Sequence, residues 1–269
     1  LSMLAICLWE YRGILPVGRA IDCMKIALLS DIHGNRQAYE AVMADAFARG
    51  AERFVILGDI VGYGGDPRWC VDRTIALAAE GAVVIRGNHD QAIVDPSYSM
   101  TSAAGIAIDW TRMTLEPRQR AYLAGLPMAV EEEDRLYVHA DGSAPGRFRY
   151  VTDAATARAH FDGCTARLSF CGHVHRPCLY GCSQGGKVTV FTPTSDIGIP
   201  LTAPRRWLAV IGSVGQPRDG NPAAAYGLYD TDLGELSFRR AAYDIEAAAA
   251  AIRAASLPES LATRLFQGR

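Results

Sequence analysis

The chain has 269 residues, of which 49% are hydrophobic and 21% are charged, and its formal net charge is −2. This composition is typical of a folded globular protein and excludes a disordered, collagen-like or coiled-coil chain. The slight negative charge does not favour a broad basic surface for nucleic acid, and no apolar stretch reaches the length of a membrane span.

Residues 1–23 contain a short apolar run without a basic region before it, which matches a signal peptide poorly. The sequence from Met24 onward resembles a natural start that leads directly into a strand. We therefore expect residues 1–23 to be an extension outside the core and residues 24–269 to form a single domain. Seven cysteines without a C-x-x-C pair favour reduced thiols over a disulfide scaffold or zinc ribbon, and thus a cytoplasmic protein.

The first half of the chain alternates short apolar runs with helical patterns. Strands are predicted at 25–30, 54–57 and 82–85, and helices at 35–49, 69–80, 101–113 and 117–125. The order strand, helix, strand, helix, strand predicts a mostly parallel sheet with helices packed on its faces.

The second half is richer in strands, which are separated by Gly, Pro and Asp turns. Strand-like segments lie at 135–139, 167–171, 187–191, 207–211, 226–230 and 235–240. A helix is predicted at 153–161, the alanine-rich tail at 245–266 is also helical, and the acidic run 131–134 is predicted to be a solvated hairpin turn. These patterns indicate an α/β domain of two facing sheets with helices outside.

Polar side chains follow the first two strands directly. Asp31 and His33 come after the first strand, and residues two apart in an extended chain point to the same side, so both can bind one metal ion. Gly34 allows a sharp turn immediately afterwards. Asp59 follows the second strand in the same way. Because ligands collect at the carboxyl edge of parallel strands, these groups are predicted to converge.

Three later segments repeat this placement. Arg86-Gly-Asn88-His89-Asp90 follows the third strand, His139 ends another, and His173-Val-His175 follows the strand at 167–171. Five of the six histidines thus lie at strand ends, whereas His160 lies on a helical stretch and is expected to be a surface or half-buried structural residue. A mixed set of His, Asp and Asn suits divalent Mn, Fe, Co, Ni or Zn.

The motifs D-x-H, G-D, G-N-H-D, a strand-end His and G-H-x-H occur in this order over residues 24–245. Together they resemble the calcineurin-like metallophosphoesterase family, and the stretches 58–66 and 212–219 resemble its small bacterial and archaeal branch, which includes phosphatases and dinucleoside polyphosphate hydrolases. The resemblance implies a four-layer α/β/β/α sandwich of two mixed sheets.

The resemblance also implies a role for each motif residue. Two divalent metal ions are expected, the first on Asp31, His33 and His175, the second on Asn88, His139 and His173, with Asp59 bridging both. A hydroxide shared by the metals would attack phosphorus, His89 would protonate the leaving group, and Asp90 would hold the tautomer of His89. Ala140 and Val174 depart from the residues usual in the family, but neither change removes a ligand.

Substrate-binding candidates are Asn88, Arg86 and Arg218. Arg86 can equally pair with a core carboxylate, and the turn around Arg218 is explained by its Pro and Gly alone. Tyr63 either caps a substrate base or is a packed loop aromatic.

The predicted substrate is a small phosphoester, a dinucleoside polyphosphate or a phosphoprotein, and a homo-oligomer is left open. A catalytically silent metal-binding scaffold is the alternative. A nuclease is less favoured because the chain has no net positive charge and is too short to carry additional DNA-binding regions.

Overall fold

The protein is described by a computed structural model that covers residues 24–98, 100 and 102–269. The predicted N-terminal extension, residues 1–23, lies outside the described residues. Within them, no helix is both long enough and apolar enough to cross a membrane.

The described residues form two six-stranded sheets. The first sheet contains, in spatial order, β3 (Val83–Val84), β2 (Arg53–Ile56), β1 (Lys25–Leu29), β11 (Ala224–Asp230), β12 (Glu235–Ala241) and β9 (Gly198–Pro200). Strands β1, β2 and β3 are parallel, as predicted, whereas β11 runs antiparallel to β1 and makes the sheet mixed.

The second sheet contains, in spatial order, β4 (Ala129–Glu132), β5 (Arg135–Val138), β6 (Leu168–Cys171), β10 (Arg206–Val210), β7 (Cys178–Cys182) and β8 (Val188–Phe191). It is mixed as well, since β6 is parallel to β5 and β10 while β7 is antiparallel to β10. The predicted acidic turn is shorter than expected: Glu131 and Glu132 belong to β4, and the chain reverses at Glu133 and Asp134.

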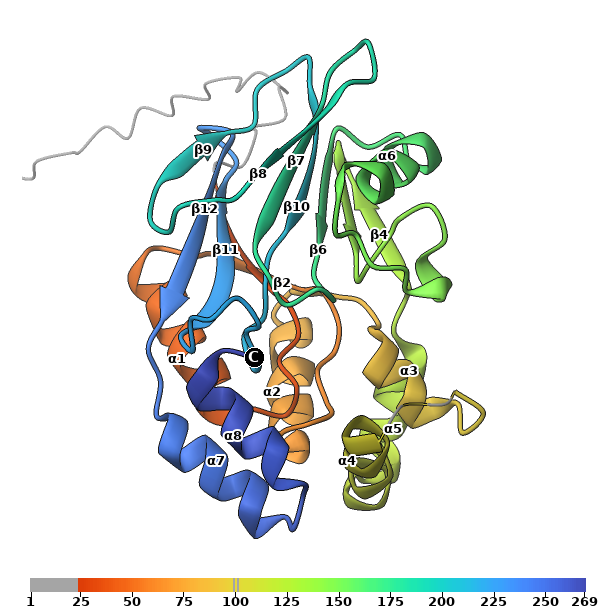
Figure 1. Ribbon diagram of the computed structural model, residues 1–269, viewed down its shortest axis with the longest axis vertical. Coiled ribbons are helices and arrows are strands. Elements are labelled where there is room, and N and C mark those ends of the chain that lie inside the picture. The colour runs from red at the N-terminus through yellow and green to blue at the C-terminus, as the bar shows by residue number, and fades with distance from the viewer. Residues whose placement is uncertain (1–23, 99, 101) are drawn as a thin grey trace, which may run out of the picture.

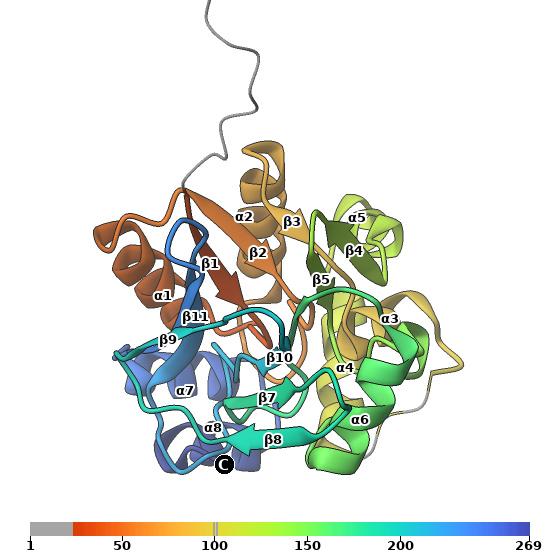
Figure 2. The same cartoon turned by 90° about the horizontal axis from the view of Figure 1, so that it is seen from above.

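Alternation along the strands explains why the sheets stack face to face. In β1, Ile26 and Leu28 point into the layer between the sheets, where they join Tyr137 and Phe170 of the second sheet. Their neighbours in sequence point to the opposite face, against α1 and α2. The second sheet has an outer core of its own, which contains Phe161 of α6. Figures 1 and 2 show the resulting helix, sheet, sheet, helix layers, and the predicted α/β/β/α sandwich is confirmed.

The helices are α1 (Arg36–Ala48), α2 (Pro67–Ala79), α3 (Asn88–Val94), α4 (Ser102–Thr114), α5 (Pro117–Gly125), α6 (Ala154–Gly163), α7 (Ile245–Ala254) and α8 (Glu259–Gln267), with a 3-10 turn η1 (Pro145–Arg147). The tail predicted as one helix is two, because Ser256 adopts a left-handed conformation with φ 55° and Pro258 precedes α8. Helices α7 and α8 pack on each other beside α1 (Figure 1).

Candidate metal centre

The loops after β1 and β2 place three ligand candidates in left-handed backbone. Asp31, His33 and Asp59 have φ of 55°, 52° and 54°, a conformation that costs energy for residues other than glycine. Two backbone hydrogen bonds tie the loops together: Asp31 N donates to Gly58 O at 3.1 Å, and His33 N donates to Asp59 O at 2.9 Å. The strained backbone is therefore held by pairing between the two loops.

The second sheet supplies the remaining histidines from β5 and β6. His139 lies at the end of β5, and both His173 and His175 are left-handed, with φ of 67° and 61°. The backbone N–H of His173 donates to Asp31 Oδ2 at 2.8 Å, which joins the sheets at the site. Gly172 has no room for a Cβ, since Ser30 and Asp31 side chains lie directly against it. A glycine is thus required where the two sheets meet.

Three imidazoles are oriented by backbone carbonyls. Nδ1 of His33 lies 3.1 Å from Val61 O, Nδ1 of His139 lies 2.7 Å from Leu57 O, and Nδ1 of His175 lies 2.6 Å from Gln216 O. A carbonyl oxygen can only accept a hydrogen bond, so Nδ1 of each of these imidazoles carries the proton. Nε2, on the other side of each ring, then faces the cluster, which is the orientation typical of metal-binding histidines.

Two pairs of acceptors face each other closely in this arrangement. Nε2 of His33 and Nε2 of His175 are 3.1 Å apart, and Nε2 of His175 is 3.1 Å from Asp31 Oδ1. Asp31 Oδ1 is buried and has no hydrogen-bond partner among the described residues. Burial lowers the pKa of His175, so its Nε2 is a bare lone pair. Lone pairs at this separation repel unless a cation lies between them, so these residues fit a metal ion.

The ligand candidates fall into groups that share members. Donor atoms within 4.8 Å of one another occur in three such groups: Asp31 with His33 and His175; His33 with Asp59 and His89; and Asp59 with His139 and His173. Asp59 belongs to two groups and is 1% exposed. Asn88 Oδ1 joins the third group at 3.1 Å from His139 Nε2. Every ligand candidate predicted from the sequence is therefore in one buried cluster.

Charges within the cluster oppose the effect of burial. Burial is the largest single influence on the pKa of Asp31 and raises it, but the neighbouring His175, His33 and His139 together lower the pKa well below its ordinary value. Burial lowers the pKa of His139, yet Asp59 raises it to about 9. Burial lowers the pKa of His173 to about 3, and its Nε2 has no hydrogen-bond partner in the described part of the chain. His173 is thus neutral and free to bind a metal ion.

The expected contact between Asp90 and His89 is absent, which corrects the sequence-based assignment. Asp90 Oδ1 accepts from the backbone N–H of Ile60 at 3.0 Å, and Oδ2 accepts from Gly87 N at 3.0 Å. Nδ1 of His89 is buried without a partner among the described residues, while its backbone N–H donates to Asp59 Oδ1 at 2.8 Å. Asp90 lies in the first turn of α3 and holds the loops around it, because backbone donors occupy its carboxylate.

The two arginines predicted to bind substrate differ in their surroundings. Arg86 donates to Gln91 Oε1 at 2.9 Å and to the carbonyl of Ala124, so its guanidinium is held between α3 and α5. These contacts do not favour substrate binding, and Arg86 pairs with no carboxylate of the described residues either. Arg218 lies at the cluster instead: its backbone N–H donates to His175 O at 3.0 Å.

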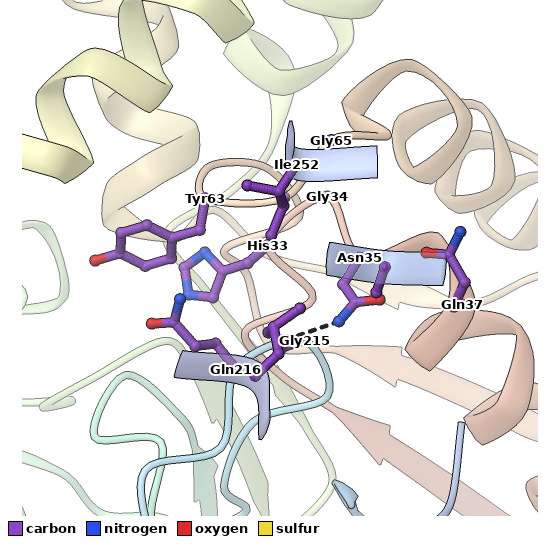
Figure 3. A pocket seen from close by; sticks show the side chains of 12 residues that line it. His33, Gly34, Asn35, Gln37, Tyr63, Gly65, Gly215, Gln216 and Ile252 are labelled. Carbon is purple, nitrogen blue, oxygen red and sulfur yellow. Dashed lines mark hydrogen bonds between the residues drawn. The ribbon is translucent and has the colours of Figure 1, made fainter. Parts of the chain in front are cut away.

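Aromatic rings cover the cluster. The ring centroid of Tyr63, a residue with φ 62°, lies 4.6 Å from the ring centroids of both His33 and His89. Figure 3 shows the Tyr63 ring beside the His33 imidazole. Tyr150 stacks on His173 at 4.1 Å with 16° between the rings and is 53% exposed. Tyr150 was missed from the sequence because it lies in a loop without any periodic pattern.

His160 is fully buried, so its predicted surface or half-buried position is wrong. Its Nδ1 accepts from Gly142 N at 3.0 Å, in the loop that follows His139. The sequence correctly predicts that His160 lies on a helix, which is α6. The face of α6 that carries His160 packs against the second sheet and is therefore buried. His160 is structural, as expected.

Comparison with known proteins gives consistent matches. Residues 24–234 match the calcineurin-like phosphoesterase superfamily domain. An uncharacterized protein of Methanocaldococcus jannaschii is 33% identical over 91% of this chain and 98% of its own length. Phosphodiesterase YfcE of Escherichia coli is 26% identical over 78% of this chain and 89% of its own. A metallophosphoesterase structure from Sphaerobacter thermophilus superimposes with a TM-score of 0.82 at 34% identity, covering 92% of this chain and all of the other.

Proposed function

Because this chain belongs to the calcineurin-like phosphoesterase superfamily, and is therefore a metal-dependent hydrolase of phosphoester bonds, we propose that it works with two divalent metal ions at the buried cluster. The observation that carries the proposal is the position of Asp59, whose Oδ2 lies 3.7 Å from His33 Nε2 in the first set of ligands and 3.3 Å from His139 Nε2 in the second. Asp59 would therefore help to hold both ions.

The remaining ligands divide between the two ions. Asp31, His33 and His175 would hold the first, and Asn88, His139 and His173 the second. Both ions would supply positive charge for the phosphate oxygens and lower the pKa of a water nucleophile. Mn, Fe, Zn, Co and Ni all suit this donor set.

The chain's own residues contribute positioning and a proton. Burial lowers the pKa of His89 well below its ordinary value. An anionic phosphate beside the ring would favour the protonated form of His89. Substrate binding would therefore protonate His89, which could then donate this proton to the leaving oxygen. Asp90 would position His89 indirectly, since it accepts from the backbone N–H groups of Gly87 and Ile60 on either side of the site.

The substrate is proposed to be a small phosphoester or dinucleoside polyphosphate, with a phosphoprotein as the wider alternative. The relative YfcE is called a phosphodiesterase, which supports including phosphodiesters. Tyr150, half-exposed on top of His173, offers a free ring face to a planar leaving group.

The test is a hydrolysis panel in the presence of Mn²⁺ with p-nitrophenyl phosphate, bis-p-nitrophenyl phosphate, diadenosine tetraphosphate and a phosphopeptide. We expect turnover that EDTA abolishes and that His89→Ala reduces by about 10²–10⁴-fold in kcat. Absence of turnover on every substrate by protein that binds two metal ions would refute the enzymatic proposal and indicate a metal-binding scaffold.

A further inference from the structure

An open hollow next to the metal cluster is lined by arginines that the proposed chemistry does not use. Its lining residues are Arg176, Arg218, Asp219, Gly220 and Arg269, and its volume is about 450 Å³. Arg176 is exposed and Arg218 is partly buried. The hollow lies where the segment after β6 meets the segment after β10.

The hollow is joined to the cluster through His175. Arg176 follows His175 directly in the chain, and Arg218 N donates to His175 O at 3.0 Å. The guanidinium of Arg218 donates to Gln216 Oε1 at 2.9 Å and to the hydroxyl of Tyr63 at 3.4 Å. Figure 3 shows Gln216 and Tyr63 on either side of the His33 imidazole. A group bound by Arg218 is therefore next to the ligands of the first metal ion.

The positive charge of the hollow is not neutralised. Among the described residues, no acidic side chain forms an ion pair with Arg176 or Arg218, whereas Asp219 is engaged by Arg240. Nε of Arg176 donates to the carbonyl of residue 218 at 2.6 Å, which fixes the guanidinium plane and leaves its terminal nitrogens free. Two arginines that line one hollow without a counter-charge attract an anion, and the planar fork of a guanidinium group matches phosphate.

We propose that this hollow binds a second phosphate group of the substrate, so that the enzyme prefers substrates with at least one phosphate beyond the one that is cleaved. The inference rests on the proposed phosphohydrolase function. Arg218 lies between the two positions, and Arg176 contacts only the second phosphate. The preference is thus set by charge in the hollow rather than by recognition of a particular organic group.

The experiment compares two substrates with identical ends: a 5′–5′ linked diadenosine monophosphate, with one phosphate, and diadenosine tetraphosphate, with four. The readout is the ratio of kcat/KM for the tetraphosphate to that for the monophosphate, in excess Mn²⁺. For the wild-type protein we expect a ratio above one, and for Arg176→Ala a ratio about tenfold lower, as expected for one charge-assisted hydrogen bond. Arg176→Lys should restore part of the ratio, since it restores the charge without the fork.

Arg205→Ala is the matched control. It removes the same charge from the opposite end of β10, where Arg205 lies over Trp207, and should leave the ratio unchanged. Circular dichroism and metal content of each variant verify that fold and cluster are intact.

The outcomes separate the two proposals. A ratio that Arg176→Ala does not change, or a wild-type ratio at or below one, overturns the phosphate subsite and leaves the phosphohydrolase standing. Hydrolysis of bis-p-nitrophenyl phosphate with no turnover of either dinucleoside compound would also overturn the phosphate subsite and leave the phosphohydrolase standing. Failure of the wild-type protein on all three, with metal bound, overturns the proposed function itself.

Discussion

The histidines of the cluster differ in whether a backbone carbonyl lies at Nδ1. His33 and His175 are each fixed by a carbonyl at Nδ1, whereas Nδ1 of His89 has no partner among the described residues. The proposed role of His89 is proton transfer, although it also lies within ligand distance of Asp59.

This assignment predicts different metal contents for two alanine variants. His173→Ala should lose about one metal ion per chain after dialysis, because the ring offers a bare Nε2 to the second ion. His89→Ala should keep the wild-type content. Inductively coupled plasma mass spectrometry measures both, and equal loss in the two variants would make His89 a ligand instead.

His160 gives the fold a pH dependence from a buried histidine that lies outside the metal cluster. Burial lowers its pKa from 6.5 to about 4, with Asp141 opposing and Arg206 adding to the shift. Between these values the unfolded chain binds a proton that the folded chain does not, so stability is complete above pH 6.5 and falls as the pH drops towards 4.

We expect the free energy of unfolding to fall by about 2 kcal/mol more in the wild-type protein than in His160→Asn between pH 7.5 and pH 5. Asparagine keeps an acceptor near the position of Nδ1 but cannot be protonated. Urea titrations of both proteins in EDTA measure this difference. The same pH slope in both proteins would show that other groups carry the acid dependence.

The membership of the cluster could be predicted because it depends on residue types at strand ends. Asp31, His33 and Asp59 follow clear apolar runs in the sequence. Because parallel strands end at the same edge of a sheet, residues that follow them lie close together. The partner of Asp90 could not be predicted, because it depends on backbone N–H groups whose directions appear only when the loops are folded. Tyr150 and Arg176 had no pattern to mark them either.

Among the elements, the junction of α7 and α8 shows that a single proline can end a helix that a long alanine-rich pattern predicts to be continuous. Alanine-rich periodicity predicts an unbroken helix, yet Pro258 cannot continue α7 without losing a hydrogen bond. The chain turns at Ser256, which is exposed and left-handed with φ 55°. Strands β4, β7 and β9 were not predicted from the sequence, which marked 131–134 as a turn and gave no clear pattern for the other two.

Ser256→Gly should therefore raise the free energy of unfolding by about 0.5–1 kcal/mol, since the relief of the left-handed strain exceeds the entropy that glycine adds to the unfolded chain. Ala255→Gly is the control, because Ala255 has φ −76° and gains only the entropy cost. Thermal or urea unfolding measures both variants. A destabilised Ser256→Gly would mean that the turn carries no strain.

At the scale of the whole molecule, the metal centre joins the two sheets. Asp31, His33 and Asp59 come from the first sheet, and His139, His173 and His175 come from the second. Ions that bind only the folded state stabilise it in proportion to the logarithm of their concentration. Removal of metal therefore weakens the docking of one sheet on the other.

Mn²⁺ at about 100 times its dissociation constant should raise Tm by about 10 °C, from a stabilisation of about 2.7 kcal/mol for each of the two proposed ions. Asp59→Ala should abolish most of this rise, because Asp59 would help to hold both ions. Differential scanning calorimetry with and without EDTA gives the two shifts. An Asp59→Ala protein that gains the full rise of about 10 °C would place the ions elsewhere.

The division of the ligands between the sheets also sets an order of events during synthesis. A nascent chain that has reached residue 90 carries Asp31, His33 and Asp59, yet β1 still lacks its neighbour β11, which comes more than a hundred residues later. The histidines of β5 and β6 follow in between. Each proposed ion site needs a histidine from β5 or β6, so we expect a polypeptide that ends before β5 to lack the residues that complete either site.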